Sequence, residues 1–120
     1  AAMDENTVTL LEDAKGIEEG QVIYAANCAA CHGMAGEGTV GPNLTDEYWL
    51  HGGSVKDVFK VIKYGVPEKG MISWEKQLPP LDIQKVASYI LSIQGTNPAN
   101  AKEPQGDLYK EEGAIAAQSE

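Results

Sequence analysis

The stretch NCAACHG, residues 27–33, contains both cysteines of the chain and one of its two histidines. Cys28, Cys31 and His32 form the pattern C-x-x-C-H. On a helical turn, residues i and i+3 project to the same side, so both thiols can react with one flat partner. The pattern is that of c-type haem attachment, where the thiols add to two vinyl groups and the histidine reaches the iron. The motif therefore predicts a covalently bound haem c.

Three other uses of the motif compete with haem attachment. A thioredoxin-type dithiol follows a strand in a βαβ unit, and no strand pattern precedes Cys28. A structural zinc site needs four ligands, usually in two spaced pairs, and only His51 remains as a further typical ligand. A disulfide between Cys28 and Cys31 would close a very short loop and add little stability. Haem attachment is the preferred interpretation.

Periodic apolar residues and capping signals around the motif predict three helices, over residues 17–30, 54–64 and 80–94. Ser54 is the expected N-cap of the second helix, and Pro79-Pro80 suits the start of the third. Gly20 is costly inside the first helix, which is explained if another helix crosses there at close range. Shorter helices are predicted over 8–14 and 46–50, and no segment shows a convincing strand pattern.

The expected fold class is therefore all-α, with three main helices, short helices and long loops. The loops over residues 33–43 and 65–78 are rich in glycine and proline, and so few helices cannot easily stabilise them. A haem is a large apolar body around which a small chain can wrap. We expect it to supply the missing core contacts.

The composition restricts the possible partners. The chain has 120 residues, about one domain, and a net charge of −9 with no arginine, which argues against nucleic acid as a partner. The acidity is concentrated in residues 1–20 and 101–120. No stretch approaches the roughly 20 apolar residues of a membrane span. No signal peptide is visible, and a chain that begins Ala1-Ala2 is compatible with an export signal already removed.

The second axial ligand of the haem iron has to come from elsewhere in the chain. Met34 is too close to His32 to reach the opposite face, and Met3 lies in an acidic terminal segment. His51 would give a bis-histidine site, although such a residue is more often a surface histidine. Met71 lies in the loop over 65–78, far enough along the chain to cross the porphyrin. We predict Met71 as the ligand, the alternative being a methionine that fills a gap in the core.

Residues 17–94 resemble the class I monohaem cytochromes c. The resemblance rests on CxxCH near a first helix, on the GPNL stretch at 41–44, on a methionine in a late loop and on a final amphipathic helix. Gly20 and Tyr24, with Val86 and Tyr89, occupy positions where the first and last helices of that family cross. The stretches GPNLTDEYWLHGG (41–53), KGMISW (69–74) and VASYILSIQGTNPA (86–99) most resemble cytochrome c domains of haem–copper oxidase systems of the cbb3 and caa3 types. The dihaem subunit of cbb3-type oxidases has two haem motifs, whereas this chain has one CxxCH.

The resemblance implies a role for individual residues. Cys28 and Cys31 form thioethers with one haem c, and His32 and Met71 ligate the iron. The Pro42 carbonyl accepts a hydrogen bond from the other ring nitrogen of His32. The expected donors to the haem propionates, or packing residues against its plane, are Tyr48, Trp49 and Trp74, with His51 as a further possibility. Tyr64 is expected to pack beside the iron.

With both axial positions filled, the iron has no open site for a substrate. We therefore expect a single-electron carrier and not an enzyme, with a quinol-oxidising complex as donor and a haem–copper oxidase as acceptor. The alternatives are a haem sensor or peroxidase-type enzyme with a displaceable methionine, and an excised domain of an oxidase subunit. The expected location is the bacterial periplasm or the outer face of the cytoplasmic membrane, and the expected state is a monomer. The predicted organisation is an acidic extension over 1–16, a cytochrome domain over 17–96 and a second acidic extension over 97–120.

Overall fold

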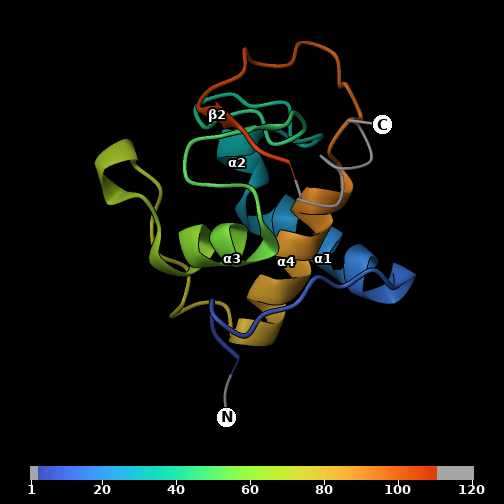
Figure 1. Ribbon diagram of the computed structural model, residues 1–120, viewed down its shortest axis with the longest axis vertical. Coiled ribbons are helices and arrows are strands. Elements are labelled where there is room, and N and C mark those ends of the chain that lie inside the picture. Colours follow the sequence, from blue (N-terminus) through green and yellow to red (C-terminus); the bar gives the residue numbers. More distant parts are fainter. Residues whose placement is uncertain (1–2, 111–120) are drawn as a thin grey trace.

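The computed structural model describes residues 3–110 and contains three main helices connected by long loops (Figure 1). In chain order the elements are α1 Ala14–Asn27, α2 Ala29–His32, β1 Tyr48–Trp49, α3 Val55–Tyr64, the 3-10 helix η1 Pro67–Lys69, α4 Pro80–Ser92 and β2 Asp107–Leu108. The predicted all-α class is confirmed. Among the described residues, no helix is long and apolar enough to cross a bilayer.

The two short helices predicted from the sequence are wrong. In place of a helix over 46–50, the Asp46 carboxylate accepts a hydrogen bond from the Tyr48 amide at 3.0 Å, a local contact that competes with helix formation. Tyr48–Trp49 then pairs antiparallel with Asp107–Leu108, a distant segment that local periodicity cannot reveal. Residues 8–13 are also not helical, because α1 begins only at Ala14, where the Asp13 carboxylate caps it by accepting from Gly16 N at 2.8 Å.

The crossing of α1 and α4 forms the centre of the fold, as the resemblance implied. A Cβ placed on Gly20 would lie 2.1 Å from the Lys85 carbonyl oxygen and 2.9 Å from the Tyr89 Cβ. The backbones therefore approach so closely that only glycine fits at this point. One turn further along α1, the rings of Tyr24 and Tyr89 meet with their centroids 5.3 Å apart, in a tilted arrangement.

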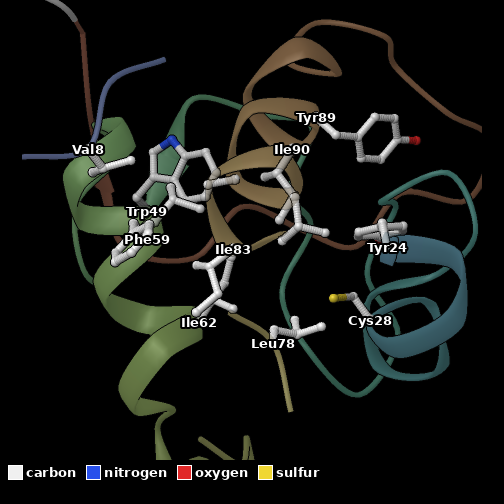
Figure 2. Packing of buried hydrophobic residues seen from close by; sticks show 13 residues of the cluster. Val8, Tyr24, Cys28, Trp49, Phe59, Ile62, Leu78, Ile83, Tyr89 and Ile90 are labelled. Atoms are coloured by element: carbon white, nitrogen blue, oxygen red, sulfur yellow. The ribbon is translucent and has the colours of Figure 1, made fainter. Parts of the chain in front are cut away.

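Helix α3 packs against α4 through a narrow apolar face. The predicted capping box at its start is present, since Ser54 Oγ accepts from Asp57 N and the Asp57 carboxylate accepts from Ser54 N. Phe59, in the middle of this face, is fully buried. Figure 2 shows the resulting core, in which the Cys28 sulfur points inward toward Leu78.

Residues 3–13, which we call the N-terminal strap, run along the core (Figure 1). Val8 is only 1% exposed. Leu11 N donates to Ser88 Oγ at 3.0 Å, and Gln84 Nε2 donates to the Thr9 carbonyl at 2.9 Å, so two side chains of α4 hold the backbone of the strap. The described part of the predicted N-terminal extension is therefore packed against the core, although the division into domains stays a prediction.

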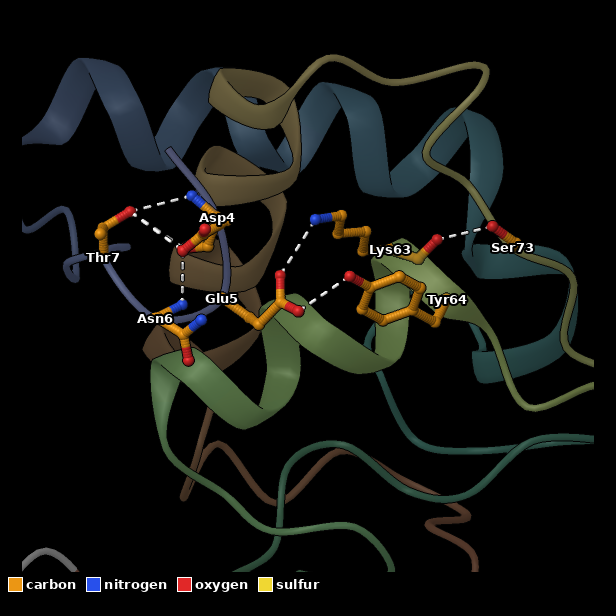
Figure 3. A network of polar contacts seen from close by, with 7 residues as sticks. All are labelled: Asp4, Glu5, Asn6, Thr7, Lys63, Tyr64 and Ser73. Atoms are coloured by element: carbon orange, nitrogen blue, oxygen red, sulfur yellow. Dashed lines mark hydrogen bonds and ion pairs between the residues drawn. The ribbon is translucent and has the colours of Figure 1, made fainter. Parts of the chain in front are cut away.

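Glu5 joins the strap to α3 (Figure 3). Its carboxylate accepts hydrogen bonds from Lys63 Nζ at 3.0 Å and from the Tyr64 hydroxyl at 2.8 Å. A hydrogen bond from its own backbone amide, together with those from Lys63 and Tyr64, lowers the pKa of Glu5 from 4.5 to about 2. The charged form of Glu5 is therefore favoured in the folded protein.

We expect Glu5→Gln to lower the melting temperature by a few degrees at most at pH 7. The folded protein binds a proton on Glu5 more weakly than the unfolded chain does, so the stabilisation is complete above pH 4.5 and is lost as the pH falls toward 2. Thermal melts of both proteins across this range should converge at the acid end. Glu12→Gln, an exposed change in the same strap, is the control, and a Glu5 effect that did not depend on pH would contradict this account.

Candidate functional site

The C-x-x-C-H motif lies on a helical turn directly after α1. Cys28 N donates to the Tyr24 carbonyl at 2.8 Å, and His32 N donates to the Cys28 carbonyl at 3.0 Å. The two cysteines are free, Cys28 buried and Cys31 exposed. Burial is the main cause that raises the pKa of the Cys28 thiol to about 11, and the nearby Cys31 contributes a smaller part. The Cys28 side chain is therefore neutral near pH 7. One cysteine of the motif therefore contacts the core, and the other lies at the surface.

The ring of His32 is held from one side. Its Nδ1 lies 2.9 Å from the Pro42 carbonyl oxygen, which is the contact that the resemblance implied. With Nδ1 donating to that carbonyl, Nε2 is the nitrogen left to bind a metal. Burial lowers the pKa of His32, the Pro42 carbonyl opposes this effect, and the Lys102 charge adds to it. A Cβ on Gly41 would lie 2.6 Å from the His32 Cε1, so the loop can approach the ring only with glycine there.

Further hydrogen bonds attach the surrounding backbone to the motif. The Tyr24 hydroxyl donates to the Gly33 carbonyl at 2.7 Å. The Cys31 carbonyl accepts from Thr39 Oγ1 and from Gly41 N, both at 2.7 Å. Tyr24 was predicted only at the helix crossing, and Thr39 and Gly41 were not predicted as site residues. The Gly-Pro pair was the available signal for Gly41, whereas no local pattern indicated Thr39.

Met71 is presented by a closed loop that starts at the end of α3. Val66 and Met71 exchange backbone hydrogen bonds of 2.9 and 3.1 Å around η1. A Cβ on Gly65 would lie 2.6 Å from the Ile72 carbonyl carbon, so this glycine lets the returning strand of the loop lie against α3. Ser73 Oγ donates to the Lys63 carbonyl at 2.6 Å. Half-buried Met71 contacts the hydrophobic core, and its role as an iron ligand stays a prediction.

The residues expected near the haem propionates lie in different environments. Trp49 is buried, and its indole Nε1 has no hydrogen-bond partner among the described residues. Trp74 is half-buried against the core, whereas Tyr48 is 40% exposed. His51 is exposed and lines a pocket of about 320 Å³ that includes neither cysteine, nor His32, nor Met71. Of this group, only Trp49 has an unmet need for a hydrogen-bond acceptor.

Tyr64 lies partly at the surface and contacts the N-terminal strap. Its side chain is 43% exposed and its hydroxyl donates to Glu5, so the structure uses it to hold the N-terminal strap (Figure 3). No local pattern indicated this contact, because Glu5 lies far from Tyr64 along the chain, in a segment outside the resemblance. Packing of Tyr64 beside the iron stays a prediction.

The residues present fit a covalent haem c. Two thiols lie one helical turn apart, and the adjacent histidine has one ring nitrogen fixed and the other available. The unpartnered Trp49 Nε1 is a donor suited to a propionate carboxylate, and in Figure 2 it lies on the far side of the core from Cys28. The vinyl groups that form the thioethers lie across the porphyrin from the propionates. A propionate donor on the far side of the core from Cys28 is therefore what a bound haem would require. No three His, Cys, Asp or Glu side chains within residues 3–110 are placed to hold a metal ion by themselves.

The fold is that of a cytochrome c. The structure superposes on cytochrome cL from Hyphomicrobium denitrificans with a TM-score of 0.63 and 28% identity, covering 87% of this chain and 64% of that one. Cytochrome cL from Methylophaga aminisulfidivorans gives a TM-score of 0.64 and 26% identity over 68% of this chain and 55% of that chain.

Residues 15–90 match the family described as "Cytochrome C oxidase, cbb3-type, subunit III", and the chain belongs to this family. The subunit CcoP of a cbb3-type oxidase from Cereibacter sphaeroides is 44% identical over 89 residues, which are 69% of this chain and 29% of that protein. The subunit FixP from Azorhizobium caulinodans is 37% identical over 68% of this chain and 31% of that protein. The predicted resemblance is confirmed, and the chain spans about a third of the length of these relatives.

Proposed function

We propose that this chain is a single-electron carrier with one covalently bound haem c, and that it delivers electrons to a respiratory haem–copper oxidase. The observation that carries the proposal is the His32 ring, oriented by the Pro42 carbonyl at 2.9 Å beside two free cysteines on one helical turn. Cys28 and Cys31 would hold the haem through thioethers. His32 Nε2 and the Met71 sulfur would bind the iron.

When bound, the haem supplies a one-electron ferric–ferrous couple. The chain's own residues hold the backbone around it in place. Backbone bonds close the loop that carries Pro42, which orients His32, and the loop that carries Met71. Neither His32 nor Met71 therefore has to move far when the charge of the iron changes. Because both axial positions are assigned to side chains, no coordination site is left for a substrate, and the chain is not expected to be an enzyme.

The partners and the location follow from the relatives. Proteins named as cbb3-type oxidase subunits support a haem–copper oxidase as acceptor, and a quinol-oxidising complex as donor completes the route. We expect the chain to work as a monomer in the bacterial periplasm or at the outer face of the cytoplasmic membrane. The short coverage of the relatives favours a second possibility, a cytochrome domain that belongs to a larger oxidase subunit.

The proposal is tested by the absorption spectrum of the protein produced with a haem-attachment system. We expect a low-spin spectrum in both oxidation states, haem that stays with the chain on a denaturing gel, and no carbon monoxide binding to the reduced form at neutral pH. Cys28→Ala or Cys31→Ala should each leave one thioether and shift the pyridine haemochrome band, whereas the double variant should lose covalent haem.

Two results would contradict the carrier function. A high-spin spectrum would show an open coordination position, as in a peroxidase-type enzyme. Carbon monoxide binding to the unaltered reduced protein would show a displaceable methionine, as in a haem sensor. Wild-type protein that bound no haem would remove the proposal altogether.

A further inference from the structure

Residues 97–110, which we call the C-terminal strap, arch over the end of the fold that carries α2 (Figure 1). The C-terminal end of this strap, residues 107–110, is attached to the segment around β1. Strand β2 pairs with β1, Tyr109 N donates to the Glu47 carbonyl at 2.9 Å, and Lys110 forms an ion pair with Glu47. Between residues 99 and 108, Lys102 alone is half-buried while its neighbours are exposed. This strap lies beyond the residues that match the family.

Lys102 attaches the strap to the loop over residues 37–43. Its backbone N donates to the Glu37 carbonyl at 2.8 Å, and its backbone carbonyl accepts from Asn43 Nδ2 at 3.2 Å. Its side chain Nζ donates to the Val40 carbonyl at 3.3 Å. A Cβ on Gly38, whose φ is +90°, would lie 2.9 Å from the Lys102 Cβ, so the contact needs glycine in the loop.

These attachment points surround Pro42, whose carbonyl orients His32. Glu37 and Val40 precede Pro42 in the loop and Asn43 follows it directly. The backbone that presents the Pro42 carbonyl is therefore held from both sides by one residue of a distant segment. Contacts of this kind, one step removed from a ligand, orient it and tune the metal.

The ammonium group of Lys102 is bound to the same loop that presents the Pro42 carbonyl, since its Nζ donates to the Val40 carbonyl. It forms no ion pair with any of residues 3–110. The nearest acidic residue along the loop, Glu37, uses its carboxylate to accept from Ala35 N at 3.0 Å. A fixed positive charge disfavours the ferric state, which carries one positive charge more than the ferrous state.

We propose that Lys102 is a positioning residue for the haem: it holds the Pro42 loop against His32, and its charge raises the reduction potential. This inference rests on the proposed function, because it needs a haem on His32. Lys102 lies outside the residues that match the family, and a lysine in such a segment would ordinarily be interpreted as a surface residue.

The test is a redox titration of the holoprotein with three substitutions. Lys102→Met keeps most of the aliphatic stem and removes the charge, Lys102→Arg keeps the charge, and Lys15→Met removes a charge from an exposed position. Lys15 lies at the start of α1, about 20 Å of helix away from the motif. We expect Lys102→Met to shift the potential downward, and the other two proteins to match the unaltered one.

A second readout is the NMR signal set of the axial His32 ring in the same proteins. We expect it to change in Lys102→Met, which loses the side-chain bond to the Val40 carbonyl, and to return with arginine, which can donate there again. The backbone bonds of residue 102 survive both substitutions, so the comparison isolates the side chain. Equal potentials for Lys102→Met and the unaltered holoprotein would overturn the inference, and so would an equal shift in Lys15→Met. If Lys102→Met did not hold haem, Lys102→Gln would be judged by the same criteria. Loss of haem from the unaltered protein would instead refute the proposed function.

Discussion

Met71→Ala is expected to keep the haem attached and to convert a closed iron centre into an open one. The substitution removes the proposed sulfur ligand but leaves Cys28, Cys31 and His32 unchanged. The reduced variant should bind carbon monoxide, and its potential should fall by a sizeable part of the roughly 0.8 V range that axial ligands control. Spectroscopy with added carbon monoxide and a redox titration measure both effects.

Met34→Ala is the matched control for this experiment. Met34 is 69% exposed and lies two residues past His32, so its loss should change neither the potential nor ligand binding. The loop should survive the Met71 change, because it is closed by the backbone bonds between Val66 and Met71 and not by the methionine side chain. A Met71→Ala protein with unaltered potential and no carbon monoxide binding would show that another residue ligates the iron. His51→Ala and Met3→Ala would then test the two remaining candidates.

Gly20→Ala, which adds one methyl group to α1, is expected to lower the stability of the protein considerably. In an isolated helix, alanine in place of glycine is stabilising by about 1 kcal/mol. In this protein the new Cβ would lie 2.1 Å from the Lys85 carbonyl oxygen, a backbone atom that cannot move unless α4 moves. Overpacking in a core costs typically 1–3 kcal/mol and occasionally more, so we expect a net loss of at least ~2 kcal/mol. That loss is a considerable part of a domain's total stability.

Denaturant unfolding of the ferric holoprotein, followed by circular dichroism, measures this loss. Gln21→Ala is a suitable control, since Gln21 is exposed on the same helix and its change should leave the midpoint almost unaltered. A Gly20→Ala protein as stable as the unaltered one would mean that the two helices can separate at no cost. The close crossing would then not be needed for the fold.

Much of the site could be predicted because its signals are local. The spacing of Cys28, Cys31 and His32 is a property of one helical turn, and it indicated haem attachment before any fold was known. The Ser54 capping box and the apolar stripe of α3 are local in the same way, and the structure contains both. Gly20 could be predicted to lie at a helix crossing because glycine in mid-helix is unfavourable without such a reason.

The failed helix over residues 46–50 shows what pairing between distant segments decides. Residues 46–50 were predicted as a helix, but an Asp46 turn and the partner strand Asp107–Leu108 make the segment extended. The hydrogen bond from the Tyr64 hydroxyl to Glu5 of the N-terminal strap could not be predicted for the same reason, because the two residues lie far apart along the chain. Local patterns do not contain the identity of a partner far along the chain.

The contacts of the two acidic ends of the chain also depend on residues far away in the sequence. An acidic composition is compatible both with solvated extensions and with packing against the core. The last ten residues of the C-terminal extension lie outside the described residues. Within residues 3–110, both ends are attached to the core by specific contacts, Glu5 with Lys63 at one end and Lys110 with Glu47 at the other. Charge counts alone could not distinguish these arrangements, because the same residues serve either.

The chemistry of this protein was therefore readable from its residues, since the thiols, the histidine and their spacing act within one turn of helix. Which groups support that chemistry depended on the folded chain. The Pro42 carbonyl lies on His32 because Gly41 admits close approach, and Lys102 holds the same loop although many residues separate it from the motif. Such contacts arise only when the backbone closes on itself, because their strength depends on distances of about 3 Å that no linear pattern records.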